Sequence, residues 1–503
     1  MRWTALPLLV AATGCNWVFG LQQTRGIDAP PPPPDIPDAL VVRMVFERQV
    51  GTTDTSGTAI QGAPVAIDPP PTIQTGPMPG ALQPADYDAT MRSFVVPSNL
   101  PGNPWRLVVT SDFDPVPTEI QWTANSAHLV LPWLARPGDA PPPAGSGWDF
   151  QAQGTGIVIA NPRVMTSGAF TETNAQADLA GNAEVTFHYA QHAKPILGPL
   201  GTPTVAQGDW ALLYDYRIIT NSPTQKIDGS IGHAWTQADL TAGALTTVKP
   251  AWVTTTAGVS GINWATPINQ PRFGGVSSLG GTCCSFHLEY GILPSPYIAP
   301  FVPSPDGVDT TSLIQLYVED NTTSAPISIS VNDPPTTQVK LPRMLLAAYQ
   351  APRTSNGVTV TNTIQTLGTA KTLTFAAPLA ESVTLGGMTL MTGSLDNQQI
   401  PASASTITLK WTAEASTANL TLGADDWVVT LYEVASSAMT PIRRYQVLSP
   451  RVDVDGGLLM TGHRYVFGIT SRSGFPNAPQ GDYSTVTLPF SETTTFPLMF
   501  VVM

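Results

Sequence analysis

The chain has 503 residues, enough for about three domains, and only 12% of them are charged. A formal net charge of −13 at pH 7 argues against nucleic acid as a partner and against adsorption to anionic lipid through basic patches. Few charges, 50 prolines and much Thr, Ser, Val and Gly are typical of short strands joined by tight turns, so we expect an all-β protein.

The first residues have the pattern of an export signal. A positive start at Arg2 precedes an apolar run, Trp3–Gly14, which is shorter than the ~20 residues of a membrane-spanning helix. The run stops at Cys15 and resembles the bacterial lipobox, although Ala12 stands where that family usually has Leu. The resemblance implies a signal peptide at 1–14 and acyl chains (diacylglycerol, palmitate) on Cys15. Because Asn16 rather than Asp follows, it also implies the cell outer membrane. The alternative is an ordinary secretory signal with an incidental cysteine.

Residues 15–39 are predicted to form a tether. Five consecutive prolines lie within Ala29–Pro37, which as polyproline II would span roughly 28 Å. A stiff spacer between lipid and protein is the simplest interpretation, and a ligand for a proline-recognition domain is the alternative.

Residues 40–135 read as short strands with turn residues between them, a spacing that predicts a β-sandwich. The predicted strands are 40–46, 63–67, 94–96, 105–109, 119–122 and 128–131. Gly62–Ile67 and Phe94–Val109 resemble the carboxypeptidase regulatory-like, transthyretin-type sandwich, with Trp105 in place of the more usual Tyr. That resemblance implies a non-catalytic module.

Residues 136–147 are a linker by composition, and 148–397 form a β-rich middle region of one or two domains. Strands are predicted at 184–189, 209–216, 313–318 and 358–360. Several aromatic side chains lie here: Trp210, Tyr214, Tyr216, Trp235, Trp252, Trp264 and Tyr290. They are expected to form a sandwich core, the alternative being a stacking surface for sugar rings.

Residues 398–503 begin with a strand that ends in Trp411 and continue with a long apolar strand, 427–434. Leu459 lies six residues before Tyr465, which starts another strand. This pattern resembles a fibronectin type III domain. The resemblance implies that Trp411 is a core residue and that Tyr465 is a corner tyrosine whose hydroxyl bonds back to the upstream backbone. The stretch 487–503 is longer than one final strand requires.

Cys283 and Cys284 are adjacent within a glycine-rich segment. Their Cα atoms lie about 3.8 Å apart across a trans peptide, below the usual range for a disulfide, so a vicinal bridge would be strained. An oxidising envelope nevertheless favours oxidation. Three interpretations stay open: a vicinal disulfide, two buried thiols, and an intermolecular link or metal site.

Other candidate clusters have structural explanations. His287 and Glu289 share a strand face near Cys284, but a tetrahedral zinc site needs four converging groups. His188 and His192 would lie about 13 Å apart on a strand, too far to share one ion. The run 453–457 resembles the start of a calcium loop but has Arg464 where the last ligand would stand. We therefore predict neither a metal nor another cofactor.

The sequence as a whole predicts tandem β-sandwiches on a proline-rich tether behind a lipoprotein signal. The expected function is a non-catalytic cell-envelope lipoprotein, a surface binding or structural module anchored to the outer membrane through Cys15. A glycan or protein is the expected kind of ligand. The alternative is an envelope hydrolase acting on glycans or peptides, with its site in 148–380. The sequence contains no Gly-x-Ser-x-Gly elbow, P-loop or dinucleotide fingerprint.

Overall fold

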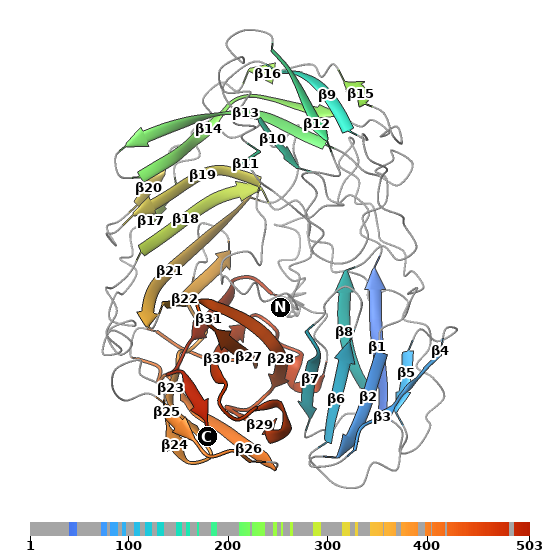
Figure 1. Ribbon diagram of the computed structural model, residues 1–503. Helices are drawn as coiled ribbons and strands as arrows, with labels where there is room; N and C mark the ends of the chain where they lie inside the picture. The colour runs from blue at the N-terminus through green and yellow to red at the C-terminus, as the bar shows by residue number, and fades with distance from the viewer. Residues whose placement is uncertain are drawn as a thin grey trace, which may run out of the picture.

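The protein is described by a computed structural model in which strands dominate (Figure 1). The described residues are 40–47, 72–77, 81–88, 93–96, 105–110, 116–122, 128–134, 147–152, 157–160, 169–170, 183–188, 211–221, 224–236, 245–248, 253–254, 262–264, 285–292, 314–321, 327–329, 343–355, 357–368, 374–390, 398–403, 405–417, 420–481 and 487–503. Within them every regular element is a strand or a short 3-10 helix, which confirms the predicted all-β fold. Among these residues, no helix has the length and apolar character needed to cross a membrane.

The N-terminal strands form two sheets. One has the order β4-β5-β1-β8, with β1 and β8 parallel, and the other runs β3-β2-β6-β7 with antiparallel pairs. The strands are β1 (Leu40–Glu47), β2 (Thr72–Pro77), β3 (Gln83–Pro84), β4 (Asp86–Asp88), β5 (Ser93–Val96), β6 (Trp105–Thr110), β7 (Thr118–Trp122) and β8 (His128–Leu134). Five of the six predicted strands are thus confirmed, and the predicted strand 63–67 lies outside the described residues. Ile73, Phe94, Leu107 and Ile120 are buried in this part of the molecule.

The middle strands belong mainly to one extended sheet. Its members here are β10 (Ile157–Ala160), β11 (Ala169–Phe170), β13 (Ala211–Asn221), β14 (Thr224–Thr236), β16 (Val253–Thr254), β18 (Ser285–Ile292), β19 (Ile314–Asn321), β21 (Arg343–Ser355) and β22 (Val358–Gly368). Two small sheets accompany it, formed by β9 (Gly147–Ala152), β12 (Ala183–His188) and β15 (Leu245–Val248), and by β17 (Ile262–Trp264) and β20 (Ile327–Ile329).

The C-terminal strands form a two-layered sandwich. One layer has the order β24-β23-β26-β29, and the other contains β28-β27-β30-β31, with β32 on β30 and β25 on β32. The elements are β23 (Ala380–Leu385), β24 (Met388–Thr389), β25 (Gln398–Ile400), β26 (Thr406–Ala413), β27 (Asp426–Ala435), β28 (Ala438–Val447), β29 (Arg451–Asp455), η2 (Gly456–Leu458), β30 (Arg464–Ser473), η3 (Ala478–Gln480), β31 (Phe490–Thr495) and β32 (Phe500–Val502). Strands β23 and β24, which precede residue 398, therefore pair within this sandwich.

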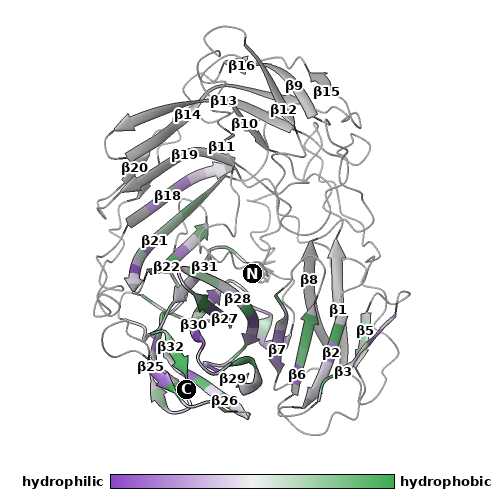
Figure 2. Cartoon of the chain, viewed as in Figure 1, coloured by the Kyte–Doolittle hydropathy of each residue, from purple (hydrophilic) through white to green (hydrophobic). Residues whose placement is uncertain are grey.

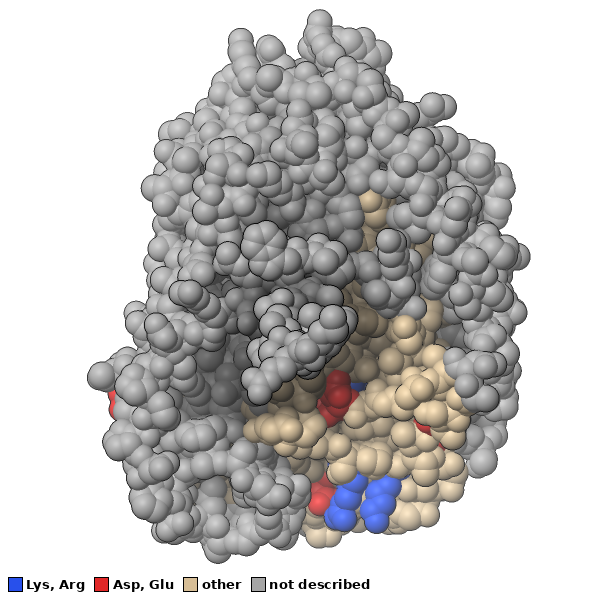
Figure 3. All heavy atoms as spheres, turned by 180° about the vertical axis from the view of Figure 1, so that it is seen from behind, with Lys and Arg blue, Asp and Glu red and all other residues tan. Residues whose placement is uncertain are grey.

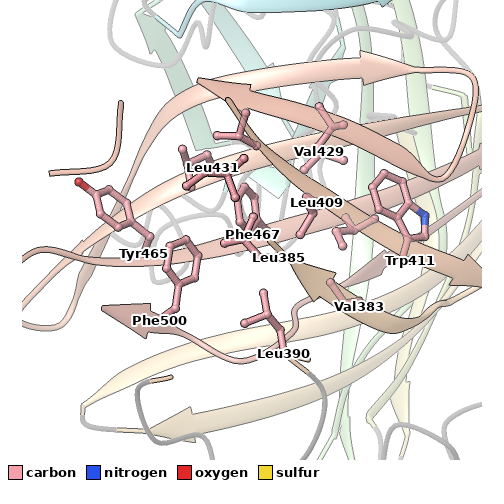
Figure 4. Packing of buried hydrophobic residues seen from close by; sticks show 14 of the residues in the cluster. Val383, Leu385, Leu390, Leu409, Trp411, Val429, Leu431, Tyr465, Phe467 and Phe500 are labelled. Atoms are coloured by element: carbon pink, nitrogen blue, oxygen red, sulfur yellow. The ribbon is translucent and has the colours of Figure 1, made fainter. Parts of the chain in front are cut away.

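The core of the C-terminal sandwich lies between its two layers. Strand alternation directs Leu385, Leu409 and Trp411 from one layer toward Val429, Leu431, Phe467 and Phe500 of the other (Figure 4). The rings of Trp411 and Trp427 meet edge to face at 5.3 Å between centroids. Trp411 is buried, as the resemblance to a fibronectin type III domain implied.

The corner tyrosine is also in its predicted place. The backbone N–H of Met460 donates to the hydroxyl oxygen of Tyr465 at 2.8 Å, while the tyrosine ring packs 5.7 Å from that of Phe500. Leu459, next to this bond, is buried in the same core. The hydrogen bond fixes the connection that leads into β30.

A third layer covers the outer face of the C-terminal sandwich. The end of the β21-β22 hairpin brings Val358 and Val360 against a second apolar cluster, whose other members are Tyr432, Val434, Val466, Phe496 and Met499. Apolar residues on both faces explain why β27 is buried along almost its whole length. In Figure 2, β6 and much of β21 have the green of apolar residues.

Hydrogen bonding makes the three parts continuous. Strand β22 pairs with β31 through Thr363–Leu367, which joins the middle region to the C-terminal sandwich. At the other edge of the layer β28-β27-β30-β31, β7 pairs with β28 and so adds the N-terminal sheet β3-β2-β6-β7 (Figure 1). Nineteen of the described strands are connected in this way. These nineteen strands therefore form one hydrogen-bonded sheet that runs through all three parts.

Candidate functional site

The best-described polar cluster lies where β7 meets the strands β28 and β29 at one edge of the C-terminal sandwich. We call this junction of β7 with β28 and β29 the seam. A sandwich has exposed strand edges with unpaired N–H and C=O groups, which β-proteins cover or pair. Strand β7 pairs in parallel with β28 in the register Thr118↔Arg444, Glu119↔Tyr445 and Ile120↔Gln446. The N–H of Arg444 also donates to the carbonyl of Pro117 at 3.0 Å.

A side chain of β7 pairs with β29, the edge strand of the other layer. The Gln121 amide donates from Nε2 to the carbonyl of Asp453 at 2.5 Å and accepts from the Asp453 N–H through Oε1 at 2.9 Å. Gln121 thus supplies to β29 the donor and the acceptor that a neighbouring strand would offer. With β28 paired to the β7 backbone and β29 paired to a β7 side chain, one strand joins both layers.

The polar face of β7 is buried in the seam. Arg106 and Gln121 face each other across β6 and β7, and Glu119 lies on the same face by the two-residue period of a strand. Glu119 is only 1% exposed and accepts from Gln121 Nε2 at 2.9 Å. Arg106 Nη1 lies 3.8 Å from Glu119 and 3.9 Å from Asp455. One arginine therefore contacts one carboxylate from each side of the junction.

Burial governs the electrostatics of the seam. Loss of solvent raises the pKa of Glu119, and the Gln121 hydrogen bond with the charges of Arg106 and Arg443 reverses only part of that effect. The neighbouring Tyr445 is fully buried, and burial, together with the charge of Glu119, raises the pKa of its phenol. The Tyr445 hydroxyl makes no hydrogen bond within the described part of the chain.

A buried ion pair lies next to the seam. Gln446, which pairs with Ile120 of β7, donates from Nε2 to Asp426 Oδ2 at 2.8 Å. Asp426 is fully buried and accepts from Arg472 Nε at 2.9 Å and also from Arg472 Nη2. The Arg472 guanidinium lies 4.7 Å above the ring of Phe475. A connected series of polar contacts therefore leads from β7 to β30.

A second buried carboxylate lies at the other edge of the same layer. Glu492 on β31 accepts from Gln365 Nε2 of β22 at 2.7 Å, across the joint with the middle region. Burial raises the pKa of Glu492, and the charge of Arg472 opposes that effect. Both joints of this layer thus contain a glutamine paired with a buried glutamate.

Charged side chains are sparse on one described face of the molecule. Seen from behind, the described surface is mostly uncharged, and basic and acidic side chains lie close together at its lower edge (Figure 3). Only 12% of the chain is charged, and four of its charged side chains are buried in or beside the seam: Arg106, Glu119, Asp426 and Arg472. What the seam can do chemically is hold two sheets in a fixed register.

Most residues singled out by the sequence lie outside this seam. Cys15, Cys283 and Cys284 fall outside the described residues, so lipidation of the first and the redox state of the other two stay predictions. His192, Trp210 and Trp252 are outside them too, while His188 lies on β12. Tyr290, from the aromatic group, is buried on β18.

His287 and Glu289 do share a face of β18. Their Nε2 and Oε2 atoms lie 3.6 Å apart, an ion pair when the histidine is protonated. Among the described residues, no group of three or more His, Cys, Asp or Glu side chains is placed to hold a metal ion. The structure therefore places these two residues as a pair.

The run that resembles a calcium loop has structural partners instead. Asp453 Oδ1 accepts from the Thr408 hydroxyl at 2.6 Å and pairs with Arg451, while Asp455 Oδ1 accepts from the Gly457 N–H at 3.0 Å. The same run contributes Asp453 and Asp455 to the seam. In the structure the run is the end of β29 followed by the start of the 3-10 helix η2.

The sequence pattern did not reveal the seam residues. Glu119, Ile120, Gln121 and Trp122 alternate polar and apolar, which is the pattern of a strand with one face in solvent. The same alternation fits a strand whose polar face packs on another domain. Only the burial of Glu119 distinguishes the two cases.

Comparison with known proteins identifies no family. No protein-family model matches the chain, and no curated protein matches it. Among solved structures, the chain is similar to the FN1–FN3 domains of chicken CNTN1, at 9% identity over 90% of this chain and 99% of that one, with a TM-score of 0.13. A TM-score this low supports no conclusion, so the fold rests on the strand pairing described above.

Proposed function

We propose that this chain is a non-catalytic, lipid-anchored module of the cell envelope that presents a rigid β-structure for binding or spacing. The observation that carries the proposal is the seam, where one strand is bonded to both layers of the C-terminal sandwich. A presenting or spacing protein must keep its parts in fixed positions, and paired strands with buried polar contacts provide that.

We infer further that the C-terminal sandwich is of the fibronectin type III kind. Supporting this are the strand orders β23-β26-β29 and β28-β27-β30-β31, the buried Trp411 on β26 and the bond from the Met460 N–H to the Tyr465 hydroxyl. Sandwiches of this architecture serve many binding roles, and the fold alone does not select a ligand.

The anchor is tested by metabolic labelling. In a bacterial host with lipoprotein processing, the chain should incorporate labelled palmitate and fractionate with the outer membrane, and Cys15→Ala should abolish both. Cys283→Ala is the control and should be labelled as the unaltered chain is. Release of an unlabelled, soluble chain would mean that the first 15 residues are an ordinary secretory signal.

The binding role is tested by screening the chain against immobilised glycans and peptidoglycan while following hydrolysis in the same wells. Saturable binding without product supports the proposal. Turnover of any glycan or peptide would instead establish the envelope hydrolase and overturn the non-catalytic role.

A further inference from the structure

The β21-β22 hairpin buries an arginine close to its turn. Arg353 on β21 is 3% exposed and faces Val360 of β22 in the strand register. Val360 belongs to the apolar cluster that includes Tyr432 and Phe496. A guanidinium is rarely placed in such surroundings without a partner of opposite charge.

Asn362 lies beside Arg353 on the hairpin. Ala351 faces Asn362 and Arg353 faces Val360, so the two polar side chains are diagonal neighbours on one face of the hairpin. Both contact the main chain of Phe496. Arg353 Nη1 donates to the Phe496 carbonyl at 2.9 Å, and the Phe496 N–H donates to Asn362 Oδ1 at 2.7 Å. Two independent bonds to one residue hold the pair in place.

The remaining polar atoms of the pair are all hydrogen-bond donors. Nε and Nη2 of Arg353 and Nδ2 of Asn362 are buried and reach no acceptor in the described part of the chain. Nε and Nη2 form the side-on fork of the guanidinium, the geometry that binds the two oxygens of a carboxylate. Nδ2 is an additional donor on the same strand face.

The charge of Arg353 also favours an anion as the ligand. Among the described residues, no carboxylate forms a salt bridge with it. Burial lowers the pKa of its guanidinium to about 10, with no opposing contribution from a nearby anion. An anion bound at the fork would offset this desolvation cost.

We propose that Arg353 and Asn362 form a binding site for a small carboxylate. The side-on fork supplies two parallel donors, the Asn362 amide supplies another, and the single positive charge matches a monoanion. A halide offers no pair of acceptor atoms for the fork. A phosphate dianion would bring more charge and more acceptors than this donor set can satisfy.

The test is the thermal unfolding midpoint of the full chain in sodium formate, compared with sodium chloride at equal ionic strength. Formate is expected to raise the midpoint by about 2 °C at roughly ten times its dissociation constant, because a ligand that binds only the folded state stabilises it. Sodium acetate and sodium phosphate are run in parallel. A response to chloride or to phosphate equal to that of formate would overturn the carboxylate assignment.

Two variants identify the site. Arg353→Lys keeps the charge but loses the fork, and should lose the formate response. Asn362→Asp keeps the acceptor for the Phe496 N–H but places a carboxylate oxygen where Nδ2 was, so it should raise the midpoint without formate and abolish the response. Arg464→Lys is the matched control and should respond normally, because Arg464 is a half-buried arginine that donates to the Ser436 carbonyl.

Asn362→Asp provides the test if Arg353→Lys fails to fold. A normal formate response in Asn362→Asp, or no response in the unaltered chain, would refute the site.

Discussion

The side-chain amide of Gln121 pairs with both main-chain polar groups of Asp453, a residue 332 positions further along the chain. A single side chain thereby does for β29 what a neighbouring strand would do. Because β7 also pairs its backbone with β28, the N-terminal sheet joins both layers of the C-terminal sandwich. The relative position of two sheets thus depends on a few contacts that mutation can remove singly.

Removing the Gln121 amide should loosen the seam. In Gln121→Ala the N–H and C=O of Asp453 lose their partner and Glu119 loses a donor. We expect a loss of about 1–3 kcal/mol in the free energy of unfolding, measured by urea denaturation. Gln399→Ala, an exposed glutamine on β25, is the control and should change it by less than about 0.5 kcal/mol. Equal effects of the two substitutions would show that the Gln121 pairing contributes nothing.

Glu119 should make stability depend on pH. Its pKa is raised in the folded protein, so the folded state holds the proton more tightly than the unfolded state. The stabilisation is complete below the ordinary value of 4.5 and is lost as pH rises through the raised pKa. Glu119→Gln should therefore reduce the loss of stability that accompanies a pH increase. Glu492, with a pKa raised in the same direction, should keep a residual slope in that variant. Midpoints measured from pH 4 to 9 that are parallel for both chains would contradict this.

Tyr445 and Tyr465, two buried tyrosines of the C-terminal sandwich, should respond differently to loss of the hydroxyl. Tyr465→Phe leaves the Met460 N–H without its acceptor, and should cost about 1–2 kcal/mol. Tyr445→Phe removes a buried hydroxyl that has no partner among the described residues, so it should be neutral or stabilising. Urea denaturation of the matched pair checks the prediction, and a larger loss in Tyr445→Phe would be inconsistent with the seam as described.

Gly468 on β30 lies against two aromatic rings of the second apolar cluster. An added Cβ would lie 3.1 Å from the Phe496 ring and 3.3 Å from the Tyr432 ring. Gly468→Ala should therefore displace these rings and destabilise the protein by about 1–3 kcal/mol. Gly423→Ala is the control, because nothing lies within 4 Å of its added Cβ and no positive φ opposes the change. Thermal midpoints that agree for both variants would show that the two rings move without cost.

Local features were predictable from the sequence, and long-range joints were not. Strand alternation indicated the all-β class, and the resemblance to a fibronectin type III domain implied the bond of the Tyr465 hydroxyl to the upstream backbone, which the structure has at Met460. The joint between Gln365 and Glu492 spans 127 residues, and neither side chain carries a signal of its partner. The burial of Arg353 could not be predicted for a related reason. An arginine in a strand normally faces solvent, and its burial follows from the packing of the hairpin on the C-terminal sandwich.

The most direct test of the account is amide hydrogen exchange at the seam. The N–H groups of Asp453 and Arg444 donate to Gln121 and Pro117, so both should exchange slowly in the unaltered chain. In Gln121→Ala, exchange at Asp453 should become markedly faster while the amides of β30 remain protected. Fast exchange at Asp453 and Arg444 in the unaltered chain, with β30 protected, would contradict the claim that β7 joins the two layers.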